Sequence, residues 1–184
     1  MKYLLMLFLS IFGVGCYKTL EYEYYGCVHI FFPPSRDPVK SSTASHIFID
    51  LKKLSNSEKI DDKSVFIQNS GSEIEVYSGK SISSLIGQIE DLTGPSERSS
   101  YGPSYHPSRA LNAEQREVHL YSNETFSFYT DTEGNLISVN FWTSGPSSVD
   151  SLSIFGKKLT FPSFKSSVVD LFGEADEEFE YYTQ

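Results

Sequence analysis

Hydrophobic and polar residues alternate along much of the chain, which is the pattern of β-strands that bury one face. Residues 22–32 alternate and then become continuously apolar, so we predict one strand that ends at Pro33, because proline cannot continue a sheet ladder. The segment HIFIDL alternates as far as Leu51, which we place in a strand. In the N-terminal third, strands are predicted at residues 22–32, 46–51, 64–68 and 73–78.

A different spacing predicts an amphipathic helix at residues 81–94. Its apolar residues recur three or four positions apart and therefore share one face of a helix: Ile82, Leu85, Ile86, Ile89 and Leu92. Ser81 is a suitable N-cap residue, Gly94 suits the left-handed backbone that ends many helices, and Pro95 prevents continuation. The apolar face predicts that this helix packs on a sheet.

A second, shorter helix is predicted at residues 163–173, with Ser163 as N-cap residue and Gly173 at its end. Both helices end in the sequence Asp-Leu-x-Gly, and a strand followed by a Gly-Lys pair precedes each helix. This repetition predicts two related strand–helix units on a common sheet.

Three strands are predicted between the helices, at residues 117–121, 125–130 and 136–142. Asp131, Gly134 and Asn135 tolerate positive φ and predict a hairpin between the last two strands. The alternating oxygens of Asp131, Glu133 and Asn135 are also compatible with a calcium loop. Such a loop needs six or more oxygen ligands and a closing carboxylate, whereas hydrophobic strand follows here, so we favour the hairpin.

The segment 95–117 carries the clearest functional signal, because a connection of this length inside a domain is usually functional or disordered. Arginine and tyrosine are enriched at binding hot spots. The candidate protein-binding residues of this segment are Arg98, Tyr101, Tyr105, His106 and Arg109. The alternative is a flexible surface excursion.

Residues 1–16 have the composition of an export signal. Lys2 supplies the positive charge, and the apolar run that follows is shorter than the roughly 20 residues that a bilayer requires. Cys16 follows small residues, as in the bacterial lipobox, which predicts lipid attachment at Cys16, although Gly13 departs from the usual pattern. The alternative is cleavage nearby and a disulfide between Cys16 and Cys27. If Cys16 carries lipid, we expect Cys27 to be a single, buried and unreactive thiol.

Composition and charge narrow the classes of partner. The hydrophobic content of 39% with 15% aromatic residues excludes a disordered chain and favours strands. Without residues 1–16 the chain has 14 basic and 24 acidic residues, a net charge of −10. Nucleic acids and anionic lipid surfaces repel such a chain, so we expect a protein partner and no nucleic acid. Acidic residues crowd the C-terminus, which we interpret as a solvated surface or a docking face for a basic partner.

Nothing in the sequence indicates catalysis. The four histidines His29, His46, His106 and His119 lack metal-ligand spacing, and we find no nucleophile elbow and no phosphate-binding glycine loop. We therefore expect no catalytic residue, no metal site, no cofactor and no enzymatic activity.

The helix SISSLIGQIEDLTGPSE followed by strands as far as ISVNFW resembles the small α/β modules of BamE/SmpA-type envelope lipoproteins. In tandem, the same architecture resembles the beta-lactamase inhibitor protein. The phrases IFGKKLTF and LTGPSERSS are also similar to uncharacterised bacterial exported proteins of the immunity type. The resemblance covers about half of the chain and implies binding or assembly roles.

We therefore expect an α+β fold: an antiparallel sheet with two short amphipathic helices on one face and two pseudo-repeated strand–helix units. After a signal peptide at 1–16, we expect strands and loops at 17–70 and an α+β domain at 71–184, with units at 71–143 and 150–184. The expected function is an exported, lipid-anchored, non-catalytic protein-binding or assembly module of the bacterial envelope, in the periplasm or at its membranes. The alternative is an immunity or inhibitor protein that neutralises a toxin or hydrolase outside the cytoplasm.

Overall fold

A computed structural model describes residues 17–33, 43–69, 71–101, 118–123, 125–143 and 149–183. Its largest element is an eight-stranded antiparallel sheet with the order β12-β1-β2-β3-β9-β8-β7-β6. The strands are β1 (Tyr17–Tyr24), β2 (Val28–Phe32), β3 (His46–Asp50), β6 (Glu97–Tyr101), β7 (Val118–Ser122), β8 (Phe126–Thr130), β9 (Leu136–Trp142) and β12 (Glu177–Thr183).

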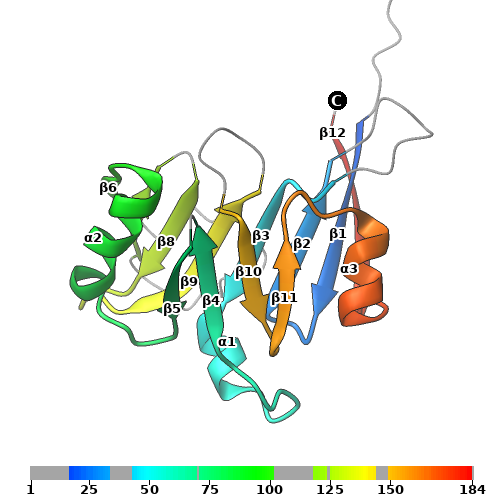
Figure 1. The fold of residues 1–184 in the computed structure, drawn as a ribbon, viewed down its shortest axis with the longest axis horizontal. Coiled ribbons are helices and arrows are strands. Elements are labelled where there is room, and N and C mark those ends of the chain that lie inside the picture. The colour runs from blue at the N-terminus through cyan, green and yellow to red at the C-terminus, as the bar shows by residue number, and fades with distance from the viewer. Residues whose placement is uncertain are drawn as a thin grey trace, which may run out of the picture.

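A second layer covers one face of this sheet (Figure 1). Four strands form a smaller sheet in the order β11-β10-β4-β5, namely β4 (Val65–Asn69), β5 (Ser72–Val76), β10 (Ser151–Ile154) and β11 (Lys157–Thr160). Helix α2 (Ile82–Thr93) packs beside β5, and α3 (Lys165–Phe172) packs beside β11, so a helix flanks each end of the small sheet. The short helix α1 (Leu51–Asn56) follows β3 directly.

The hydrophobic core lies between the two layers. Alternate residues of the large sheet face it, including Ile30 and Ile49, and meet Ile67 and Leu152 of the small sheet. Leu85 of α2 is also fully buried in this core. We call the face of the large sheet that points to the small sheet the inner face, and the opposite one the outer face. No described helix or strand packs on the outer face.

The strand order has a twofold repeat. Strands β1 to β6 with α2 make up one half, and β7 to β12 with α3 make up the other. If each strand of one half is replaced by its counterpart in the other, β1 by β7 and so on to β6 by β12, both sheets keep the same strand order, read from the opposite edge. The last strand of each half pairs with the first strand of the other half, β12 with β1 and β6 with β7. The two halves therefore complete each other's sheet.

Isolated bridges support the same repeat. Ser81, just before α2, pairs with Asn135 between β8 and β9, and Phe164, just before α3, pairs with Thr43 between β2 and β3. The backbone N–H of Leu136 donates to Lys80 O at 2.9 Å, and that of Ala44 donates to Ser163 O at 2.8 Å. Each helix thus begins against a connection of the opposite half.

The structure confirms the expected α+β class and both helices. Each Asp-Leu-x-Gly sequence ends a helix, at Gly94 with φ of 93° and at Gly173 with φ of 91°. The hairpin between β8 and β9 is also confirmed, because Asp131 Oδ1 accepts from the N–H of Glu133 at 3.0 Å and of Asn135 at 2.8 Å. The proposed domain boundaries stay a prediction, since strand pairing does not define them.

Several local predictions were wrong. The predicted strand at residues 22–32 is a hairpin, because Tyr25 and Gly26 adopt φ of 54° and 65° and turn the chain. Leu51 begins a helix, since Asp50 caps it by accepting from Lys53 N at 2.9 Å. Ser163 is not the N-cap residue of α3, because its hydroxyl donates to the carbonyl of Thr160.

The two Gly-Lys pairs are not equivalent. Gly79 lies three residues before the start of α2, whereas Gly156 makes the turn between β10 and β11. The acidic C-terminus is also more than a solvated surface, because residues 177–183 form the edge strand β12.

Candidate functional site

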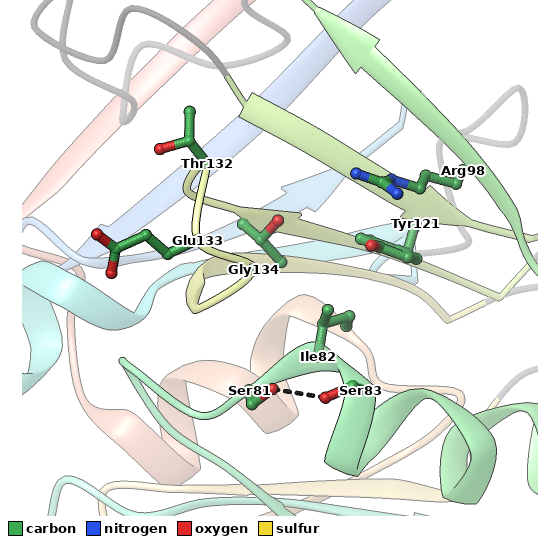
Figure 2. Close-up of a pocket in the computed structure, with 9 residues that line it drawn as sticks. Ser81, Ile82, Ser83, Arg98, Tyr121, Thr132, Glu133 and Gly134 are labelled. Carbon is green, nitrogen blue, oxygen red and sulfur yellow. Dashed lines mark hydrogen bonds between the residues drawn. The ribbon is translucent and has the colours of Figure 1, made fainter.

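A polar pocket of about 230 Å³ lies where the two halves meet, between the start of α2, strands β6 to β8 and the turn before β9. It is lined by Ser81, Ile82, Ser83, Arg98, Tyr121, Thr130, Thr132, Glu133 and Gly134. Figure 2 shows Ile82 directed toward Tyr121, with Ser81 and Ser83 beneath it. The pocket includes Arg98, which the sequence marked as a binding residue.

Main-chain hydrogen bonds fix the wall that α2 shares with the turn. The N–H of Ile82 donates to Gly134 O at 2.9 Å, and Gly79 N donates to Leu136 O at 2.9 Å. Gly134 has φ of 83°, and a Cβ there would lie 3.7 Å from Ile82 Cγ2. That separation is an ordinary van der Waals contact, so the positive φ and not a lack of space favours glycine in this turn.

The first turn of α2 presents polar groups to the pocket. The N-cap residue Ser81 makes no hydrogen bond from its side chain to the helix backbone. Its hydroxyl instead pairs with that of Ser83 at 2.8 Å (Figure 2). The first N–H groups of a helix lack intrahelical partners and favour negative charge. The two hydroxyls thus provide polar groups at this end of α2, where the N–H of Ile82 is already bonded to Gly134 O.

Arg98 supplies the positive charge of the pocket. It is exposed, and its guanidinium lies 5.7 Å from the ring centre of Tyr121, a cation–π distance. Figure 2 shows the guanidinium directed along the sheet toward the turn, while the carboxylate of Glu133 points away from Arg98 and Tyr121. Arg98 therefore places a positive side chain on the side of the pocket opposite the start of α2.

Thr130 adds an unusual polar atom to the lining. The residue is 0% exposed, and its Oγ1 has no hydrogen-bond partner. A buried hydroxyl without a partner costs about 1–3 kcal/mol, so such groups commonly mark sites that water or a ligand fills.

The structure places the predicted binding residues unevenly. Arg98 lines the pocket, and Tyr101 is the last residue of β6. Three further residues lie outside the described residues, Tyr105, His106 and Arg109. Sequence reasoning missed Tyr121 and the first turn of α2, which reach Arg98 only through the pairing of β6 with β7 and the folding of α2 over the sheet.

Cys27 has the properties that the sequence predicts for an unreactive thiol. It is free and buried, and its Sγ lies 3.7 Å from Tyr24 O. Burial, followed by the negative charge of Asp50, raises the pKa of Cys27 to about 12. Cys16, the predicted lipidation site, lies outside the described residues.

A second polar cluster lies on the outer face, at the opposite end of the large sheet. His29 Nδ1 is 2.6 Å from Glu21 Oε1 and 3.6 Å from Glu23 Oε2. Tyr181 donates its hydroxyl to Glu21 Oε2. Sequence reasoning missed this cluster because histidine and carboxylates come together through strand register, not through a spacing along the chain.

No family model, curated protein or solved structure matches the chain. Of the helices in the described part, none is long and apolar enough to cross a bilayer. The function therefore has to be inferred from the residues and their geometry.

Proposed function

We propose that the chain is a non-catalytic protein-binding module of the bacterial envelope. It is exported and held by lipid on Cys16, and it binds an extended segment of its partner along β6, with one anionic group in the pocket beside Arg98. The observation that carries the proposal is an edge strand next to a polar pocket that has a positive side chain.

Strand β6 supports this mode of binding because it ends the order of the large sheet. No described strand pairs with its outer edge, and an edge strand presents N–H and C=O groups to which an extended peptide can add. Main-chain hydrogen bonds would then supply affinity, and a side-chain pocket would supply specificity.

The size of the pocket suits one side chain of a larger partner. Its volume of about 230 Å³ is below the range of roughly 300–1,000 Å³ that is typical of small-molecule sites. Arginine with tyrosine is a common hot-spot combination at protein interfaces. The pocket therefore fits an anchor residue better than a free metabolite.

Charge limits the partner to few negative groups. The chain has a net charge of −9, so a strongly acidic partner would be repelled. A single carboxylate, from an acidic side chain or a C-terminus, would meet Arg98 and the start of α2 without that long-range cost.

A displayed peptide library tests the proposal with a defined probe. We expect selected peptides to contain one acidic residue or a free C-terminal carboxylate, and to shift the backbone NMR signals of β6 and of the first turn of α2. Arg98→Gln should weaken binding at least tenfold, because a charge-assisted hydrogen bond is lost. Lys158→Gln, an exposed change on β11, is the matched control. Equal affinity for Arg98→Gln would contradict the proposal.

Lipid anchoring has a separate test. Cys16→Ser should abolish labelling with a fatty-acid analogue and release the protein into the soluble fraction, whereas Cys27→Ser should leave labelling intact. Labelling that persists in Cys16→Ser would disprove the anchor.

A further inference from the structure

Glu21, Glu23 and His29 converge on the outer face of the large sheet. None of these residues lines the pocket beside Arg98. We infer that these three side chains bind a divalent transition-metal ion, for which Zn²⁺ is the best match. The inference is independent of the peptide-binding proposal, since the cluster lies near β12 and the pocket lies near β6.

The hairpin of β1 and β2 brings the ligands together. Glu21 and Glu23 are two residues apart on β1, so their side chains point to the same face. The register places His29 of β2 directly opposite Glu23. One atom from each of the three side chains lies within 4.8 Å of the others, close enough to converge on one ion after small rotamer changes.

The donor atoms select the class of metal. The cluster offers one imidazole nitrogen and two carboxylate oxygens. Zn²⁺ binds these donors at about 2.0–2.2 Å, whereas Ca²⁺ and Mg²⁺ prefer oxygen ligands alone. Three protein ligands also leave a coordination position for water or a further group.

Charge favours a cation as well. With a neutral imidazole, the two carboxylates give the cluster a formal charge of −2, and Glu21 is only 5% exposed. A bound dication would offset the charge of these two carboxylates. A buried ion pair recovers its desolvation cost only with excellent geometry and further hydrogen bonds.

A surrounding hydrogen bond fits a metal site. Tyr181 holds Glu21 Oε2, which leaves Oε1 on the side of His29. Hydrogen bonds of this kind orient the ligands of metal sites. In addition, His29 is 4% exposed and its Nε2 has no hydrogen-bond partner. Nε2 lies on the other side of the ring from Nδ1, which is the atom that contacts the two carboxylates, so the ligand atom of His29 is Nδ1 and not this unpartnered nitrogen.

Metal titration of the full chain tests the inference. After treatment with a chelator, we expect one equivalent of Zn²⁺ to bind in competition with a chromogenic indicator, and Ca²⁺ at the same concentration not to compete. Co²⁺ should give visible absorption bands of a bound complex, and ¹⁵N NMR should show the Nδ1 signal of His29 shifting on addition of Zn²⁺.

Variants locate the site. Glu23→Gln should weaken Zn²⁺ binding at least tenfold, and the side chain of Glu23 is 20% exposed, so this variant should fold. His29→Gln should abolish the Co²⁺ bands. Glu75→Gln, on β5 of the small sheet, removes the same charge far from the cluster and should bind as the wild type does. Absence of Zn²⁺ binding by the wild type, or equal affinity for Glu23→Gln, would overturn the inference.

Discussion

At the scale of single residues, His46 is held in a neutral form by its surroundings. Its ring stacks on Phe31 with centroids 4.0 Å apart and lies 6.1 Å from the ring centre of Trp142. Burial lowers the pKa of His46 to about 4, against the raising effect of Glu21. The stack therefore excludes a proton that the unfolded chain would bind near pH 6.

This difference predicts an acid-dependent loss of stability. Between pH 6.5 and 4 the unfolded chain gains a proton on His46 that the folded chain lacks, so the free energy of unfolding falls as pH falls. His46→Phe keeps the stacking and removes the titration. Urea unfolding at each pH measures how much more stable the variant is than the wild type. We expect this difference in the free energy of unfolding to be about 2 kcal/mol larger at pH 4 than at pH 7. A difference that does not change with pH would contradict this account.

Asn123 joins α2 to the large sheet through both ends of its amide. Its Oδ1 accepts from Thr125 N at 2.8 Å and Phe126 N at 3.1 Å, and its Nδ2 donates to Gly94 O at 2.9 Å. The side chain thus fixes the end of the helix to the start of β8.

Replacement of Asn123 should separate these two roles. We expect Asn123→Ala to lower the free energy of unfolding by about 2 kcal/mol, because several partly buried groups lose their partner. Asn123→Asp keeps the acceptors and loses the donors, so its loss should be about half as large. Urea unfolding measures the free energy of unfolding of both variants. Equal losses in the two would show that only the donor end of the amide contributes.

At the scale of elements, β12 closes one edge of the large sheet. It pairs with β1 over seven residue pairs, from Tyr17 with Thr183 to Glu23 with Glu177. Asp176 adds two contacts at the start of this ladder, since its N–H donates to Glu23 O at 2.9 Å and its carboxylate accepts from Tyr25 N at 2.5 Å. Without β12, β1 would become an unprotected edge.

Truncation after Ala175 tests this role of β12. We expect a loss of roughly 3 kcal/mol or more in the free energy of unfolding, because a whole ladder and its side-chain packing disappear. The newly exposed edge of β1 should also cause self-association, visible as increased light scattering. A chain that lacks only Gln184 is the control. A truncated chain that stays monomeric and stable would show that β12 is dispensable.

The elements also show what sequence patterns can predict. Helix α2 was predicted because its signals are local: an apolar face, Ser81 before it and Gly94 after it. Strand β12 was not predicted, because its acidic residues indicated a solvated surface and because its partner β1 lies some 160 residues away in the sequence. Arg98 was found from its unusual neighbourhood in the sequence, but Tyr121 and the cluster of Glu21, Glu23 and His29 depend on strand register, which no local pattern specifies.

At the scale of the whole molecule, the two halves are structurally interdependent. Each helix begins against a connection of the opposite half, and each half contributes one edge strand to the other. Each half alone contains only one of the two neighbours of its own first strand, since β1 needs β12 and β7 needs β6 on the other side. We therefore expect the molecule to unfold as a single cooperative unit built from two similar strand–helix arrangements.

Separate expression of the halves tests this interdependence. If the chain is divided between Arg109 and Ala110, we expect each fragment alone to show no cooperative thermal transition. Mixed in equal amounts, the fragments should form a one-to-one complex with the circular dichroism spectrum of the intact chain. Cooperative unfolding of either isolated fragment would contradict the exchanged-strand arrangement.

The pairing of β1 with β12 also has a consequence for the time course of folding. The ribosome makes β1 early and β12 last, so β1 can pair with β2 at once but must wait for almost the entire chain before its second neighbour exists. Contacts between such distant segments form slowly, and exposed edges aggregate in the meantime. During synthesis, β1 is thus the strand that a chaperone would need to protect longest.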